Sequence, residues 1–491
     1  MSKGFSFITA AFTIAAALLF LSGCMVGPNY KTPSAIMAPS FKETTPASFA
    51  ENDGWKPGHP NDTILKGDWW TLFHDAQLNQ LEAQVDKANQ TLKSAEANFR
   101  AARAQIGYVR SNEAPAIGVG PSISAVRDSA NEPYFTKALV NNGNGNFVLP
   151  FDLNYEVDLW GRIRRSVTSA RAQAQASDAD LENARLSLHA ELASDYFRLR
   201  EADAQEKLLD DTVTAYESAV QLTQDRFEGG AAPQSDVAQA RTQLDQARVQ
   251  RTDIEVQRTQ FEHAIAVLIG KPPAELTLPP IPLDQASQVL PDIPGEMPAA
   301  LLQRRPDIAA EERRMASANE QIGIAQAAYY PTLSLSAIAG FQGTSATNWL
   351  NWPSRFWAVG PSLSETLFDA GRRRAAKNIT VSQYDATVAD YRQTVLTAFQ
   401  QVEDNLAALR VLENEARQQH EATASAEQSL DLFQTRYEGG VDTYLQVVTW
   451  QTAALNNQRN DLDILERRLD ASVLLVKALG GAWDTTQMPR M

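Results

Sequence analysis

The residues with the most reactive side chains are few in this chain of 491 residues, and they are widely spaced. The histidines are not arranged as H-E-x-x-H, the pattern that places two of them on one helix face around zinc. No G-x-S-x-G element offers a serine nucleophile, and a single cysteine excludes disulfides and thiolate metal sites. The sequence therefore predicts no enzyme, no cofactor and no metal site. The five histidines are His59, His74, His189, His263 and His420.

The single cysteine, Cys24, directly follows an apolar run. Lys3 and then FITAAFTIAAALLFLSG give the order of a secretory signal. Leu21-Ser22-Gly23-Cys24 resembles the bacterial lipoprotein signal, in which cleavage before the cysteine is coupled to its acylation. A single transmembrane anchor or a chance cysteine would be the alternatives. We interpret residues 1–23 as a signal peptide and Cys24 as a lipid attachment site, and Met25, in place of aspartate, favours sorting to the outer membrane by the same resemblance.

Charge and hydropathy limit the remaining partners. A formal net charge of −15 argues against nucleic acid, because a protein that binds phosphates needs a basic face. After the signal, no second apolar run approaches the roughly 20 residues that a spanning helix needs. A membrane-crossing part would therefore have to consist of strands.

The chain contains an internal repeat. DRFEGG, which begins at Asp225, aligns with TRYEGG, which begins at Thr435, at an offset of 210 residues. At the same offset Gly161-Arg162 aligns with Gly371-Arg372, whereas upstream Ile106-Gly107 aligns with Ile322-Gly323 at an offset of 216. A repeat of this length indicates a duplicated unit rather than a solenoid of many repeats.

Each repeat contains one very long helix. Glycine and proline are absent from Arg162 to Glu228 and from Arg372 to Glu438, 67 residues in each case, and apolar residues recur at steps of three and four. At about 1.5 Å per residue, each helix would be on the order of 100 Å long. Both end at a double glycine that lets the chain reverse. Returning helices are expected at about Ser235 to Ile269 and Tyr444 to Leu479.

Pairs of strand candidates precede each long helix. In NFVLPFDLNYEVDLWG the odd positions, from Phe147 to Leu159, are apolar, and the even positions include Asp152, Glu156 and Asp158. Such alternation fits a transmembrane strand of roughly 9 to 11 residues, although a soluble half-buried sheet has the same period. The other candidates lie near residues 117–126, 332–341 and 356–368.

Four strands in one chain cannot close on themselves. In hydrocarbon, each unpaired N–H or C=O group at a sheet edge costs several kcal/mol. Because only assembly removes that cost, the sequence predicts several copies sharing one closed sheet around the acidic face.

Several motifs occur in order and twice along the chain: DLWGRIRR, RFEGG, RRPDIAAEERRMASANEQIG, LFDAGRRR and RYEGG. With the WWTLF segment at Trp69, they resemble the signature segments of TolC-like outer-membrane efflux proteins, in particular the lipoprotein branch that serves RND-type pumps. The resemblance covers the chain from Cys24 to about Gly481. It implies a mixed α/β membrane protein, a homotrimeric duct with a shared twelve-stranded barrel and a long α-helical periplasmic barrel.

The resemblance also implies a place and partners. The expected protein is a passive exit duct in the outer membrane, held by lipid, extending into the periplasm and receiving small molecules from an inner-membrane RND-type transporter through a periplasmic adaptor (membrane fusion) protein. Its expected parts are the lipidated segment and first repeat at 24–270, a proline-rich linker at 271–298, which the family uses in an equatorial collar, the second repeat at 299–480 and a tail at 481–491.

Site residues follow position by position. In the family, the R-[FY]-x-x-G turns meet the adaptor and close the idle tunnel. The tip candidates are Arg226, Phe227, Gly229, Gly230, Arg436, Tyr437, Gly439 and Gly440. Asp236 and Asp442 could form gating ion pairs with the arginines, and Tyr444 could line the aperture. Asp152, Glu156 and Asp158 are the candidates for the inner barrel surface. Gln446 and Thr449 replace acidic residues common in the family, which argues against an acidic constriction ring.

Two other functions fit parts of the sequence. A structural coiled-coil lipoprotein that tethers the envelope layers would also have long helices, but it would form no conducting channel. A periplasmic hydrolase on a helical scaffold would show activity in hydrolase screens, and its loss would not affect resistance to drugs or solvents.

Overall fold

The computed structural model describes residues 25–34, 41–43, 68–127, 129, 144–283, 304–481, 483 and 488–489. The expected signal peptide at 1–23, the expected lipid site Cys24 and part of the proline-rich linker, residues 284–298, lie outside these residues.

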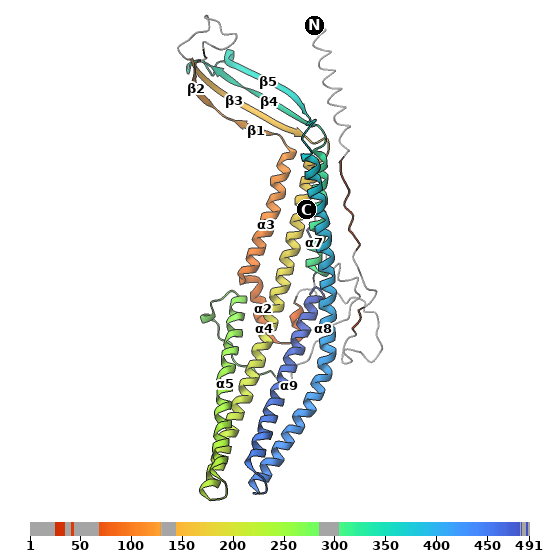
Figure 1. Cartoon of the computed structure of the whole chain (residues 1–491). Helices are drawn as coiled ribbons and strands as arrows, with labels where there is room; N and C mark the ends of the chain where they lie inside the picture. Colours follow the sequence, from red (N-terminus) through yellow and green to blue (C-terminus); the bar gives the residue numbers. More distant parts are fainter. Residues whose placement is uncertain are drawn as a thin grey trace.

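The two repeats fold into the same succession of elements (Figure 1). The first comprises a helix, strands, a long helix and a returning helix: α3 (Gln90–Arg110), β1 (Ala116–Val119), β2 (Ser122–Val126), β3 (Asn144–Val157), α4 (Arg162–Glu228) and α5 (Gln234–Leu268). The second has the same order: α7 (Pro306–Ala327), β4 (Thr332–Gly343), β5 (Arg355–Ser364), α8 (Arg372–Glu438) and α9 (Tyr444–Ala478). The short helix α2 (Ala76–Ala88) and the 3-10 turn η2 (Trp69–Phe73) precede them.

The long helices α4 and α8 have 67 residues each and coincide with the two stretches that lack glycine and proline. Each forms a hairpin with its returning helix, α4 with α5 and α8 with α9, and α3 and α7 pack beside the other halves of the long helices. The sheet lies at one end of the molecule and the turns of both hairpins at the other (Figure 1). The chain thus forms an elongated body with two chemically different ends.

The sheet is antiparallel, with the order β1-β3-β4-β5, and β2 pairs with the same edge of β3 as β1. The candidate strand near residues 117–126 is two strands, β1 and β2, which Gly120 and Pro121 separate. Proline has no N–H to donate, so the ladder is interrupted there. β5 ends at Ser364, and the residues up to Phe368 that were expected to extend it lie outside the strand.

The main apolar core lies midway along the helices rather than at either end. Trp69, Trp70 and Phe73 of η2 pack with Leu78 of α2 against the middle of α4 around Phe197, and the C-terminal parts of α5 and α9 join them. Residues of the proline-rich segment also join this core, since Leu278 and Leu283 are buried. We call this middle region of the molecule the equator. Its packing holds the two hairpins together at the ends opposite their turns.

Among the described residues, none of the helices is both long enough and apolar enough to cross a membrane.

Candidate functional site

The two hairpin tips have the same turn. Gly230 and Gly440 adopt φ values of 71° and 73°, which favour glycine. In the first tip the N–H of Ala231 donates to the carbonyl of Arg226 at 2.7 Å, and in the second Val441 donates to Arg436 at 3.0 Å. The sequence repeat therefore produces two tips with equivalent backbones.

The tip arginines nevertheless bind different partners. Arg226 reaches the other hairpin: its Nη1 donates to the carbonyl of Glu438 at 2.9 Å, and its guanidinium carbon lies 4.8 Å from the centre of the Tyr437 ring. Arg436 stays on its own hairpin, with Nε 3.0 Å from Oδ2 of Asp442. Arg226 therefore links the two hairpins, and Arg436 does not.

An aromatic cluster completes the contact between the tips. The Tyr437 and Tyr444 rings meet edge to face at 5.2 Å, and both side chains are buried. The Tyr437 hydroxyl donates to Oδ2 of Asp236 on α5 at 3.4 Å, and burial raises the pKa of Tyr437. Phe227, by contrast, is 39% exposed.

These positions refine the expected gating contacts. Asp442 lies beside an arginine, Arg436, as expected for an ion pair, but Asp236 faces the hydroxyl of Tyr437 instead of an arginine. Tyr444 was expected to line an aperture, yet it is only 2% exposed within the chain and packs between the hairpins. Their gating roles stay predictions.

The three acidic candidates for the inner surface lie in two kinds of place. Asp152 is on β3 opposite Gly118, whose missing side chain leaves room for the carboxylate. Glu156 is on the same face of β3 and is bidentate with Arg162, at 2.7 and 2.9 Å. Asp158 follows the last residue of β3. Asp158 therefore lies just outside the strand in which the alternation placed it, and the role of the three residues at the inner barrel surface stays a prediction.

Asp158 instead caps the first turn of α4. Its Oδ2 accepts the backbone N–H of Arg164 at 2.9 Å and pairs with Nε of the same residue. An acid at a helix N-terminus offsets both the dipole and the adjacent cations. Asp369 does the same for Arg373 in the second repeat. Neighbouring acidic side chains thus hold Arg162, Arg164 and Arg373 at the starts of the long helices.

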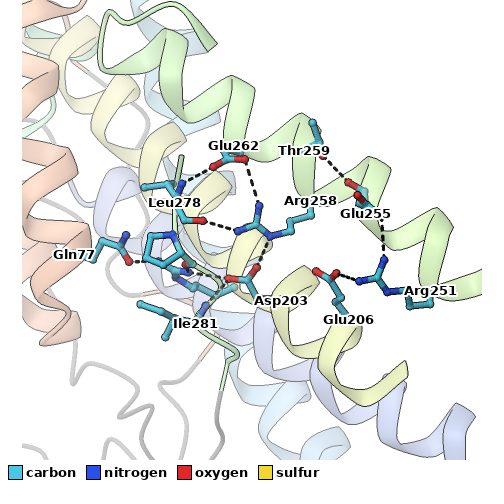
Figure 2. Close-up of polar contacts among 12 residues, drawn as sticks. Gln77, Asp203, Glu206, Arg251, Glu255, Arg258, Thr259, Glu262, Leu278 and Ile281 are labelled. Carbon is cyan, nitrogen blue, oxygen red and sulfur yellow. Dashed lines mark hydrogen bonds and ion pairs between the residues drawn. The ribbon is translucent and has the colours of Figure 1, made fainter. Parts of the chain in front are cut away.

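The sequence did not predict the polar network around Asp203, which lies at the equator of the molecule. Asp203 of α4 accepts from Nε of Arg258 on α5 at 2.7 Å, from Arg200 at 2.8 Å and from the backbone N–H of Ile281 at 2.9 Å. Figure 2 shows Arg258 between Asp203 and Glu262, beside Leu278. The network fastens the linker segment to both helices of the first hairpin.

A second equatorial cluster surrounds His189 of α4. Its Nδ1 lies 2.6 Å from Glu82 of α2, its Nε2 lies 3.5 Å from Asp86, and its ring stacks on Trp70 at 4.3 Å. Burial alone would lower the pKa of His189, but the two carboxylates outweigh it and raise the pKa to about 9. The imidazolium thus joins α2 to α4.

No group of three or more histidine, cysteine or acidic side chains within the described ranges is arranged to hold a metal ion. The polar clusters there are instead ion pairs between helices. Together with the antiparallel sheet at one end and the paired hairpin tips at the other, they define the class of this chain: an elongated protein of long helical hairpins that carry a sheet.

Comparison with known proteins identifies the family. Residues 81–271 and 297–481 match the sequence profile described as "Outer membrane efflux protein". The chain is 31% identical to the outer membrane protein OprJ of Pseudomonas aeruginosa over 96% of each chain. It is 30% identical to the probable efflux pump outer membrane protein TtgC of Pseudomonas putida, over 96% of this chain and 95% of that one. The outer-membrane channel OprN has a similar structure, with a TM-score of 0.82 at 28% identity over 93% of this chain and 99% of that one.

The chain belongs to the outer membrane efflux protein family. The TolC-like resemblance and the mixed α/β duct fold that the sequence predicted are thereby confirmed. It is an outer-membrane component of an efflux system, and its family consists of transport ducts rather than enzymes.

Proposed function

We propose that this protein is the homotrimeric, lipid-anchored exit duct of a tripartite pump. The two hairpin tips would receive a periplasmic adaptor protein, and an inner-membrane RND-type transporter would supply the cargo and the energy. The observation that carries the proposal is the pair of equivalent glycine turns at the end of the molecule farthest from the sheet. The protein itself would catalyse no reaction.

Assembly follows from the edges of the sheet. Among the residues that the structure describes, β5 and the β1–β2 edge each have one side without a paired strand. Unpaired backbone groups cost several kcal/mol each in hydrocarbon, so neighbouring copies must supply the missing partners. A trimer, the assembly that the family resemblance implies, would close the sheet and bring the helices of three chains around one conduit.

The Arg226 contact supports a closed state at the tips. It joins the α4–α5 hairpin to the α8–α9 hairpin through one hydrogen bond and one ring contact. Contact with an adaptor would separate these hairpins and widen the aperture. The cargo would be small molecules that the pump selects. One relative, from Pseudomonas putida, is named a toluene efflux pump outer membrane protein.

Conductance tests the proposal most directly. The purified protein should form channels in planar bilayers, whereas a structural tether of the same shape should form none. Deletion of the gene should sensitise cells to drugs or solvents, with no corresponding activity of the protein in hydrolase screens. Cysteines introduced at Ala231 or Val441, the exposed residues that follow the double glycines, should crosslink to the adaptor in cells, and the absence of any crosslink would contradict the assigned tip contact.

A further inference from the structure

The segment that follows the expected lipid site is tied to the junction between the sheet and the long helices. The N–H of Val26 donates to the carbonyl of Trp160 at 3.1 Å. The carbonyl of Val26 in turn accepts from Nε of Arg165, on the first turn of α4, at 2.7 Å. Both backbone groups of this one residue are therefore held by the β3–α4 junction.

Arg165 is an unusual residue for such a role, because its side chain is completely buried. Its Nη1 donates to Glu320 of α7 at 2.7 Å, and the Glu320 side chain is 9% exposed. Removing an ion pair from water is costly, so the Arg165–Glu320 pair adds little net stability by itself. Its presence at this buried position therefore needs another explanation. The planar guanidinium provides that explanation, because it binds the Glu320 carboxylate and the Val26 carbonyl at the same time. An ammonium group would do this less well.

Glycines let the segment approach closely. Gly27 has a φ of 107°, and a Cβ there would lie 2.6 Å from the Cα of Gly323 on α7. A Cβ on Gly323 would lie 2.4 Å from Cδ of Arg165. The backbone of the segment thus packs directly against the backbone of α7, and Gly323 leaves the space that the Arg165 side chain of α4 occupies.

The contact continues along α7. Asn319 Nδ2 donates to the carbonyl of Pro28 at 3.2 Å, and the Tyr30 hydroxyl donates to Glu312 at 2.7 Å. The segment is therefore fixed in direction as well as at one point, and it runs from the strand–helix junction toward the start of α7.

We propose that Arg165 and Glu320 form a seat that positions the lipid anchor. The inference rests on the proposed acylation of Cys24. Two residues span at most about 7 Å, so a fixed Val26 backbone determines where acyl chains on Cys24 can enter the membrane. That place is the boundary between the sheet and the helices. Arg165 is thus a positioning residue that aligns the anchor with the sheet during insertion and assembly.

The test combines the seat with the anchor. Arg165→Lys keeps the charge beside Glu320 but loses the planar fork, and Arg164→Lys, one position earlier and paired with Asp158, is the matched control. Each is made in the full chain and again in a Cys24→Ala chain exported by a signal peptide without a lipid site. Mass spectrometry of Cys24, hydrogen exchange of the Val26 amide and the rate of appearance of detergent-resistant trimers are measured.

With Cys24 acylated, Arg165→Lys should speed exchange at Val26 and slow trimer formation, each about tenfold, the effect of one lost charge-assisted hydrogen bond. In the Cys24→Ala chain the same substitution should change assembly less than about twofold, because there is no anchor to align. Equal slowing in both chains would mean a structural role only and would overturn the seat. An acylated chain that assembles normally with Arg165→Lys would also overturn it. An unmodified Cys24 would instead refute the lipid anchoring itself, and with it the basis of this inference.

Discussion

Arg226→Ala should loosen the contact between the two hairpin tips. In the structure, this side chain is the donor to the Glu438 carbonyl at 2.9 Å and lies over the Tyr437 ring at 4.8 Å. Alanine removes both interactions without touching the glycine turn, which is formed by backbone hydrogen bonds. The hairpins themselves should therefore keep their fold.

The expected size of the effect follows from these two contacts. A hydrogen bond from a charged group contributes about 1.5 to 3 kcal/mol, and an exposed cation–π contact about 0.5 to 1 kcal/mol. The hydrogen bond is exposed to solvent, although the Tyr437 ring is buried, so we take about 2 kcal/mol, which shifts the closed-to-open ratio about 30-fold. The thermal unfolding temperature should hardly change, because the main core lies at the equator, far from the tips.

Planar bilayer recordings measure this shift as open probability at fixed voltage. Arg436→Ala is the matched control, since Arg436 occupies the equivalent position in the second repeat but pairs with Asp442 on its own hairpin. An exposed ion pair of this kind contributes about 0.2 to 1 kcal/mol, so its loss should change the open probability only a few-fold. Equal effects of the two substitutions, or a closed Arg226→Ala channel, would refute the assignment of Arg226 as a link between the two hairpins.

Three further predictions concern the equator. Asp203→Asn should lower the free energy of unfolding by about 3 to 5 kcal/mol in urea titrations, because it leaves the buried guanidinium of Arg200 uncompensated. His189 has a folded pKa of about 9, above the ordinary value of 6.5, so the stability it contributes is complete below pH 6.5 and is lost as the pH rises through about 9. The unfolding temperature should therefore fall more steeply between pH 7 and 10 in the wild type than in His189→Gln. Gly270→Ala should destabilise the protein by more than about 1 kcal/mol in the same titrations, since a Cβ would lie 2.3 Å from the Ala88 carbonyl oxygen and φ is 72°.

Controls exist for each of these within the chain. Asp245→Asn removes an exposed acid of α5 and should be nearly neutral, and an equally small effect of Asp203→Asn would contradict the network. Gly107→Ala meets no atom within 4 Å and should not destabilise α3, so matching losses at both glycines would contradict the steric argument. Identical pH profiles of the wild type and His189→Gln would show that the imidazolium is not what joins α2 to α4.

The sequence was most informative where structure depends on local chemistry. The bounds of α4 and α8 coincide with runs free of glycine and proline, since those residues are the ones that a helix interior excludes most strongly. Alternation also indicated β3, because one face of that strand differs in polarity from the other. Local rules likewise located both double-glycine turns.

Contacts between distant segments could not be derived in the same way. Asp203 and Arg258 are ordinary charged residues on two helices, and nothing in their sequence context indicates that Ile281 will donate to the same carboxylate. The Asp158 cap was missed because alternation continues past the end of β3, whereas the pairing with β4 ends at Val157. Packing, rather than periodicity, determines these positions.

The repeat shows most clearly why sequence equivalence does not imply equivalent function. Arg226 and Arg436 stand in nearly identical motifs and begin identical turns, yet one crosses between hairpins and the other does not. The difference arises because each hairpin has a different neighbour: Tyr437 faces α5, and the position equivalent to it, Phe227, remains exposed. In the structure, Arg226 and the Tyr437 hydroxyl each reach across to the other hairpin, at the Glu438 carbonyl and at Asp236. Because Arg436 pairs with Asp442 within one hairpin, we expect separation of the tips to break the first two contacts and to leave that ion pair intact.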